Sequence, residues 1–384
     1  MLNERSPCVL SFALCRRAKR PQHGASNKRS NIMNPRQGHT LATLLLLTVT
    51  SVLGQEIAIT VDDLPFASGQ AAPLSAADVK QAQLANRAIL HALQRHRIPA
   101  TGFVTEQRAE QLGLSASRKM LLPWTRPGLD LGNHLYSHAD VNSLSVEEIE
   151  REITQGETTL TALLKQVGRR PQFFRFPYNH TGDTKEKHDT VAAFLSARGY
   201  RMPPCTIDNS DYEFNQTYAL ALSLQDEKAL ARIKDDYLAY TGAEIDWYTE
   251  LHKQVLGYEP PHIMLLHDNL LNAATIEQVL ALFQQRGYRF VSLAEALRDP
   301  AYAIPETHVT KYGTMWGYRW AQEKQIKVNG SKELEPPAWI GQYRKQHRLT
   351  CAATHVSRYV AAVFMLRSQS SHWIGARSAT AAVT

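Results

Sequence analysis

The sequence predicts an α/β fold in which short parallel strands alternate with helices. Seven short apolar runs alternate with longer stretches whose apolar residues recur at helical spacing. Residue types that cap helices stand before several of these stretches, and polar side chains follow most of the apolar runs. A repeated strand-helix-strand order gives parallel strands, with the helices either outside a closed barrel or on both faces of an open sheet.

The expected strands are residues 56–61, 100–104, 129–134, 173–176, 202–207, 262–266 and 289–292. The expected helices are residues 76–97, 146–167 and 273–286, with Ser75, Ser145 and Asn272 as their N-caps. Glu148 stands three residues after Ser145, where a capping box has its acidic residue. Two further helical stretches, 220–239 and 244–256, precede the sixth strand. The C-terminal ends of parallel strands are where such folds carry their chemistry, so functional side chains are expected there.

The charge distribution argues against a nucleic-acid partner. The chain has 384 residues, of which 43% are hydrophobic and 21% charged, a composition typical of a globular protein. Its formal net charge of +7 lies at the ends, because residues 1–54 carry +7 and residues 342–384 carry +6 with no acidic side chain. Residues 55–341 are therefore left with a net charge of −6. Binding to phosphate backbones needs a basic surface, which this acidic body does not offer.

Residues 33–54 are interpreted as a secretory signal peptide. A basic segment from Met33 to Arg36 precedes an apolar run from Leu41 to Leu53, which is shorter than the roughly 20 residues that span a bilayer. We expect cleavage after Gly54, export to the periplasm or the exterior, and no stable membrane span afterwards. Signal peptides begin near the initiator methionine, so residues 1–32 are a doubtful leader. The alternative is an uncleaved anchor with a basic cytoplasmic tail.

The remaining chain is expected to form one domain over residues 55–300 and a small C-terminal appendage over residues 301–341. The appendage contains Trp316, Trp320 and Trp339 and should pack on the main domain. Residues 342–384 lack acidic side chains and are rich in small residues, which predicts a disordered tail.

Cysteine usage limits the kinds of site that the domain can hold. Cys205 is the one cysteine between residues 55 and 341. An intramolecular disulfide and a thiolate metal site are both excluded there, so any metal must be held by histidine and carboxylate.

The first expected strand runs directly into Asp62 and Asp63. Two adjacent carboxylates repel each other unless a cation or an arginine lies close by. A solvated turn is the ordinary alternative for such a pair.

Histidines follow two other expected strands. His134 and His138 follow the third strand four residues apart, a spacing at which two imidazoles can share one metal ion. Histidine pairs are also common in cores and on surfaces. His267 ends the sixth strand, where burial can tune its pKa toward proton transfer near neutral pH.

The fourth and fifth expected strands also end in polar motifs. Arg175 is a permanent cation suited to holding a carboxylate, and Pro177 stiffens the turn after it. A surface salt bridge is the alternative for Arg175. The fifth strand leads into Asp208, Asp211 and Tyr212, for which a simple polar turn is the alternative. Each signal is modest alone, but five follow in order along the chain, each at a strand end.

Together the motifs resemble those of the polysaccharide deacetylase family, the NodB-homology group of carbohydrate esterase family four. The resemblance covers residues 55–300 and departs from the family at two places, Leu64-Pro65 and Tyr212. The matching motifs are Asp62-Asp63, His134 to His138, Arg175-Phe176-Pro177-Tyr178, Asp208-Asn209-Ser210-Asp211-Tyr212 and Leu265-Leu266-His267. The resemblance implies a distorted (β/α)7 barrel with one divalent metal ion, most often zinc, in an open groove.

The resemblance also implies a role for each motif residue. Asp63, His134 and His138 are implied to hold the ion. Asp62 is implied to be the general base and His267 the general acid.

The other motif residues are implied to support these groups or the substrate. Arg175 is implied to orient Asp62, and either Asp208 or Asp211 to orient His267, with Asp208 favoured. The backbone N–H of Tyr178, in the turn that Pro177 begins, is implied to bind the oxyanion. Leu265 would line the pocket for the acetyl methyl group, and Tyr212 would lie on the groove rim.

The resemblance implies a metal-dependent hydrolase that removes N-acetyl groups from amino-sugar polysaccharides or oligosaccharides such as chitin or peptidoglycan. One alternative keeps the site but changes the substrate to a formylated amino sugar, a small amide or a cyclic imide, because the departures lie on the rim. Another is a non-catalytic glycan-binding relic, which the complete set of catalytic residue types disfavours.

Overall fold

The structure is a computed structural model that describes residues 55–67, 74–307 and 309–353, with residues 348–353 described by their backbone alone. The expected leader, the expected signal peptide and residues 354–384 of the expected tail lie outside the described residues.

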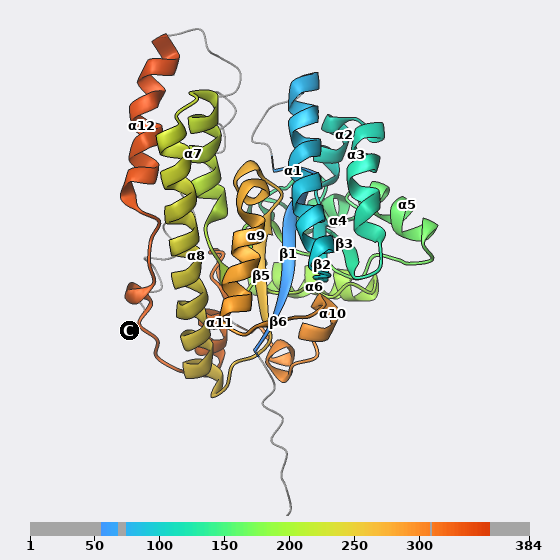
Figure 1. Cartoon of the computed structure of the whole chain (residues 1–384). Helices are drawn as coiled ribbons and strands as arrows, with labels where there is room; N and C mark the ends of the chain where they lie inside the picture. Colours follow the sequence, from blue (N-terminus) through green and yellow to red (C-terminus); the bar gives the residue numbers. More distant parts are fainter. Residues whose placement is uncertain (1–54, 68–73, 308, 354–384) are drawn as a thin grey trace, which may run out of the picture. The chain divides into compact units, whose positions relative to one another are not determined.

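A parallel sheet forms the centre of the described chain, with β1 in its middle (Figure 1). Neighbouring strands follow the order β3-β2-β1-β5-β4, and β6 pairs with the start of β1. The strands are β1 (Glu56–Leu64), β2 (Ala100–Val104), β3 (Leu129–Asn133), β4 (Ile207–Asp208), β5 (His262–His267) and β6 (Arg289–Phe290). Each pairing of these strands is parallel, which confirms the predicted α/β class.

The pairing continues beyond β3 through two isolated bridges. Phe174 pairs with Asn133 at the end of β3, and Phe173 pairs with Arg201. The chain then runs from Arg201 into β4, which pairs with β5. Segment 201–208 thus pairs with Phe173 on one side and with β5 on the other. The order of pairing therefore leads from β3 back to β5, as it does in a distorted barrel. The expected strand 202–207 is reduced to β4, because Pro203 and Pro204 have no N–H to donate to a ladder.

The first two predicted helix starts are confirmed. α1 (Ala76–Arg95) begins after Ser75, whose side chain forms a capping box with Asp78. α4 (Val146–Gln155) begins after Ser145 with the predicted box to Glu148. The expected single helix then breaks at Gly156, and α5 (Thr158–Gln166) follows. A Cβ at Gly156 would lie 2.6 Å from the Asn133 side-chain oxygen, so the chain passes too close to β3 for a side chain.

The later helices differ from the prediction in their boundaries. α9 (Leu270–Gln285) starts three residues earlier than expected and is capped by Asn269, not Asn272. The stretches expected at 220–239 and 244–256 become the end of α7 (Asp211–Ser223) and one long α8 (Glu227–Leu256). The remaining α-helices are α2 (Glu106–Leu112), α3 (Leu114–Leu121), α6 (Lys185–Ala197), α10 (Leu293–Ala296), α11 (Trp316–Glu323) and α12 (Ala338–Ala353). Figure 1 shows α7, α8 and α12 side by side and α1 beside α2 and α3.

Side-chain alternation directs the functional residues to the inner side of the sheet. Ala58 and Ile263 share one cluster with Phe103, Phe173 and Val291, contributed by five different segments of the sheet. Because alternate residues of a strand point to the same face, Asp62 lies on the face of Ala58, and His267 on the face of Ile263. The register pairs Asp62 with His267 at the C-terminal ends of β1 and β5.

The chain beyond residue 300 shares the main core. Met315, Tyr318, Trp320 and Ile340 are buried in the same cluster as residues of β1 and β5. α12 packs on α7, where an Arg344 Nη1–H donates to the carbonyl of Glu213 at 2.6 Å. The expectation of a disordered tail from residue 342 is therefore wrong for the first part of that stretch. Arg344 finds acceptors at Glu213 and Thr217 of α7, which the absence of acids within the stretch did not reveal.

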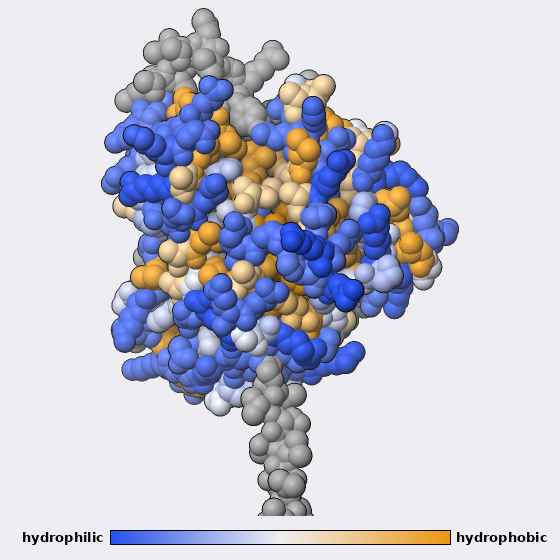
Figure 2. Space-filling model, viewed as in Figure 1, coloured by the Kyte–Doolittle hydropathy of each residue, from blue (hydrophilic) through white to orange (hydrophobic). Residues whose placement is uncertain are grey.

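The visible face of the described chain is mostly hydrophilic, with apolar residues scattered over it in groups (Figure 2). Among the described residues, no helix has the length and apolar character needed to cross a bilayer.

Candidate active site

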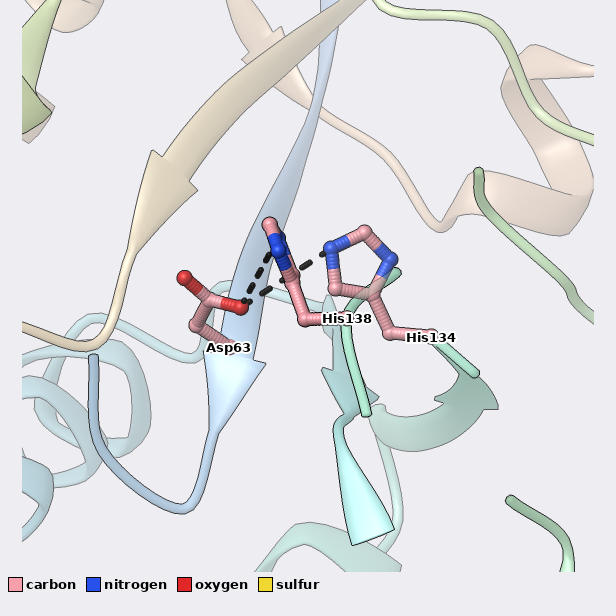
Figure 3. A group of neighbouring side chains, drawn as sticks. All are labelled: Asp63, His134 and His138. Carbon is pink, nitrogen blue, oxygen red and sulfur yellow. Dashed lines mark ion pairs between the residues drawn. The ribbon is translucent and has the colours of Figure 1, made fainter. Parts of the chain in front are cut away.

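Asp63, His134 and His138 converge at the C-terminal ends of β1 and β3 (Figure 3). The Asp63 Oδ1 lies 3.4 Å from the His138 Nε2 and 3.9 Å from the His134 Nε2. These are roughly the separations of ligands that each lie about 2 Å from a shared ion. The predicted set of metal ligands is thus brought together.

Two further contacts fix how the imidazoles face. The His134 Nδ1–H donates to the Arg175 carbonyl at 2.8 Å, and the His138 Nδ1 lies 3.1 Å from the Tyr178 hydroxyl. Both Nε2 atoms are left facing Asp63. Hydrogen bonds of this kind at the second ring nitrogen orient histidine ligands in metal proteins.

Arg108, at the start of α2, completes the environment of Asp63. Its Nη1 lies 3.1 Å from the Asp63 Oδ2, whereas the Oδ1 faces the histidines. Burial raises the pKa of Asp63. The positive charges of Arg108, His138, His267 and His134 lower it by more than burial raises it, so the net pKa is well below its ordinary range. Asp63 therefore presents one charged oxygen toward the two imidazoles.

The charge states also suit metal binding. Burial lowers the pKa of His134 and brings that of His138 to about 3, although nearby Asp63 opposes the shift in both. Both imidazoles are neutral at neutral pH, and their Nε2 lone pairs are available. Two neutral nitrogens and one carboxylate oxygen fit a divalent ion such as zinc, and three protein ligands leave a position open.

Asp62 points to a different partner. Its Oδ1 accepts a hydrogen bond of 2.8 Å from the Arg175 Nη1, which also donates to the Thr60 hydroxyl at 2.7 Å. The guanidinium lies over the Phe103 ring at 4.3 Å. Asp62 and Arg175 are both buried, so the predicted pairing takes the form of an ion pair shielded from water.

His267 is held by Asp211, and the preference for Asp208 is wrong. The Asp211 Oδ1 lies 2.6 Å from the His267 Nδ1, and its Oδ2 accepts a hydrogen bond of 2.8 Å from the His267 backbone N–H. Asp208 instead accepts from the Ser210 N–H at 2.9 Å, in a turn where Ser210 has a φ of 51°. This turn begins α7 and brings Asp211 to His267.

The Asp211 contact sets the charge of His267. Burial disfavours the imidazolium, but the charge and hydrogen bond of Asp211, with the charges of Asp63 and Asp62, raise the pKa of His267 to about 10. His267 is thus protonated at neutral pH. Because part of the rise comes from Asp63, a cation bound there would lower this pKa.

The residues expected around the substrate lie near these groups. Pro177 begins the short turn Pro177–Asn179, in which Tyr178 has a φ of 60°. Leu265 is buried on the same face of β5 as His267. The Tyr212 ring centroid lies 6.3 Å from that of His267.

Two supporting residues were missed by the sequence analysis. Arg108 stands four residues after the end of β2, a strand end at which no polar motif was sought. Asn272, expected to be a helix cap, donates instead to the Asp211 Oδ2 and to the His267 carbonyl, the latter at 2.9 Å. The position of Arg108 was a usable signal, whereas nothing in the spacing pointed to Asn272.

Comparison with known proteins agrees with these motifs. The family model described as polysaccharide deacetylase matches residues 51–201. A chitin deacetylase of Arthroderma benhamiae is 27% identical over 175 residues, which are 46% of this chain and 38% of that protein. A peptidoglycan-N-acetylglucosamine deacetylase of Bacillus cereus is 29% identical over 107 residues, which are 28% of this chain and 36% of that protein. The matches cover less than half the length of either relative.

Among solved structures, a family 4 carbohydrate esterase from Streptomyces lividans in complex with acetate is similar at 18% identity and a TM-score of 0.39. The similarity covers 61% of this chain and 90% of that one. The family match includes Asp62, the three candidate ligands and Arg175, but it ends before Asp211 and His267. The placement of these last two residues rests on the geometry given above.

The Asp62–Arg175 pair makes a stability prediction. Arg175→Met should lower the free energy of unfolding by about 3–5 kcal/mol, because it leaves the buried Asp62 carboxylate without its cation. Urea denaturation should also show that Asp62→Asn combined with Arg175→Met costs less than the sum of the two single changes. A loss below about 1 kcal/mol for Arg175→Met, or strict additivity, would contradict the pairing.

Proposed function

We propose that this chain, which carries a polysaccharide deacetylase domain at residues 51–201, removes N-acetyl groups from amino-sugar polysaccharides or oligosaccharides by metal-dependent hydrolysis. The observation that carries the proposal is the convergence of Asp63, His134 and His138 beside a paired carboxylate, Asp62, and a charged imidazole, His267. A ligand set, a base and an acid are what hydrolysis of an amide requires.

Asp63, His134 and His138 would hold one divalent ion, for which zinc is the best fit to the donor set. When bound, such an ion polarises an acetyl carbonyl and lowers the pKa of a bound water to about 7. The protein contributes the orientation of its ligands, through the Arg108 contact to Asp63 and the Nδ1 contacts of both histidines.

The chain's other residues divide the proton transfers between them. Asp62, held by Arg175, would take the proton from the attacking water. His267, kept charged by Asp211, would give a proton to the leaving amine. The backbone N–H of Tyr178 would stabilise the negative charge that develops on the carbonyl oxygen.

The substrate class follows from the relatives. Those named above act, by their names, on chitin and on peptidoglycan N-acetylglucosamine, which share an acetamido sugar. We propose the same chemical group as the substrate here. Of the two departures, Tyr212 lies beside His267 and bears on which sugar is accepted, whereas Leu64 is not on the groove rim as expected but is buried in the main core.

Acetate release tests the proposal directly. N-acetylglucosamine oligomers incubated with the protein should release acetate, and a chelator should abolish the release until zinc is restored. Asp62→Asn should lower kcat by at least about 100-fold, because the general base is lost, without preventing zinc binding measured by calorimetry.

His134→Ala supplies the matching control, since it should abolish zinc binding and turnover together. Release that survives both chelation and Asp62→Asn would refute the mechanism. Release of formate from formylated sugars, or cleavage of a cyclic imide, without acetate release would shift the proposal to the alternative substrates. Glycan binding without any cleavage would indicate a relic.

Asp208 and Asp211 give a paired test of which residue orients His267. The general acid must be protonated, so activity should fall as pH rises through the pKa of His267. Asp211→Asn removes the main cause of the high pKa, and the alkaline limb of kcat/KM should move to lower pH by at least about one unit. Asp208→Asn, close in sequence, should leave the limb in place. The reverse result would restore Asp208 as the orienting residue.

We also propose that the protein is exported through residues 33–54, with the periplasm or the exterior as its site of action. The mature chain should then begin at Gln55, as N-terminal sequencing of secreted material would show. Retention of residues 33–54 in mature protein would favour the membrane anchor, and material that begins before Met33 would refute the proposed start.

A further inference from the structure

We propose that Arg319 is a positioning residue for the turn that carries Tyr178, and that Arg319 and Gly313, from the segment 309–319, thereby form part of the active site. This inference rests on the proposed function in one respect, because it assigns importance to Tyr178 in the same reaction. The segment lies outside both the family match and the expected catalytic domain, and none of its residues belongs to a recognised motif.

Arg319, in α11, is a buried cation that donates hydrogen bonds to the turn. Its Nη2 donates to the carbonyl of Asn179 at 2.7 Å, and its Nη1 donates to the Thr181 hydroxyl at 3.1 Å. The side chain is 2% exposed, and Glu306 forms the balancing ion pair. The planar guanidinium therefore fixes the chain on both sides of residue 180 from a single rigid group.

Gly313 brings the same segment against the turn from a second direction. A Cβ at this position would lie 1.8 Å from the carbonyl oxygen of Tyr178. The backbone at residue 313 thus packs directly on the peptide that follows Tyr178, and any side chain would displace one of the two. The preceding loop is tied down as well, since the Asn142 amide donates to the Lys311 carbonyl at 2.8 Å.

The turn needs such support because its backbone is strained. Tyr178 and Asn179 have φ values of 60° and 53°, in the left-handed region that residues other than glycine adopt uncommonly. Within the turn, the His180 N–H donates to the Pro177 carbonyl at 3.1 Å. Strained residues persist where the surrounding structure fixes them. Arg319 and Gly313 are among the contacts from outside the motif that do so, together with Met315 at Asn179 and Asp140 at His180.

Loosening the turn would disturb two functional groups at once. The Tyr178 hydroxyl lies 3.1 Å from the His138 Nδ1, and the Tyr178 backbone N–H is the proposed oxyanion donor. A donor aimed at the transition state affects kcat more than substrate affinity. A misplacement of about 1 Å can reduce the rate by about 100-fold.

The test compares Arg319→Lys with Tyr318→Phe as a matched control. Lysine keeps the positive charge but lacks the planar guanidinium that donates to Asn179 and Thr181 at the same time. Tyr318 is the neighbouring buried residue of α11, and its hydroxyl donates to Glu333, away from the turn. Hydrogen exchange of the peptide covering residues 176–182 is measured by mass spectrometry, together with kcat and KM for acetate release, well below each variant's melting temperature.

Arg319→Lys should speed exchange of this peptide by at least about tenfold and lower kcat by about 10- to 100-fold, with KM within about threefold of the wild type. Tyr318→Phe should lower the melting temperature but leave both measurements within about twofold. Gly313→Ala should repeat the Arg319→Lys result, and it replaces that variant if Arg319→Lys does not fold.

Unchanged exchange of residues 176–182, or an unchanged kcat in a fully folded variant, would overturn the positioning role. An equal effect from Tyr318→Phe would overturn it too, since the effect would then be general destabilisation. If the wild-type protein releases no acetate from any glycan, the proposed function fails, and the exchange measurements alone decide whether Arg319 holds the turn.

Discussion

The site depends on how the charges of two adjacent carboxylates at the end of β1 are compensated. Asp62 and Asp63 are both buried, so their like charges would repel each other strongly if no cation lay nearby. A backbone φ of 67° at Asp63 interrupts the regular alternation of β1, and an oxygen of each carboxylate lies 3.9 Å from the His134 Nε2. Asp62 is then neutralised by Arg175 from within the sheet, and Asp63 by Arg108 and the histidines. The division between a paired base and a ligand thus follows from where compensating charge is available.

The inner face of the sheet makes the first of these pairings possible. Arg175 reaches Asp62 across the ring of Phe103, and a Cβ at Gly132 would lie 2.6 Å from that ring. The glycine on β3 therefore leaves room for the aromatic residue, which in turn supports the guanidinium. An arginine buried in this way is costly unless it is paired, so Arg175 and Asp62 hold each other in place. The packing of Phe103 inside the sheet therefore supports the ion pair at the C-terminal ends of the strands.

Much of this could be predicted from the sequence, because the information lay in short motifs at strand ends. The parallel α/β order required only the spacing of apolar residues, whereas the ligand set and the Asp62–Arg175 pair were implied by the resemblance of the motifs to a known family. The choice between Asp208 and Asp211 could not be made, because both belong to one motif and the left-handed turn at Ser210 decides which reaches His267. Contacts between distant segments, such as Asn272 with Asp211, leave no trace in local spacing. The contact of Arg344 in α12 with Glu213 in α7 likewise left no local trace, so a helix was predicted to be a disordered tail.

The extent of the functional unit is a separate question from the extent of the family match. The match ends at residue 201, yet the Asp211–His267 pair lies beyond it, and Met315 and Trp320 are buried in the same core as β1 and β5. A segment that shares the core cannot be removed without exposing apolar surface that stabilises the strands carrying the site. The same segment approaches the backbone of Tyr178 so closely that only glycine fits at residue 313. The described residues after 300 thus pack on the main core and also contact the turn that carries Tyr178.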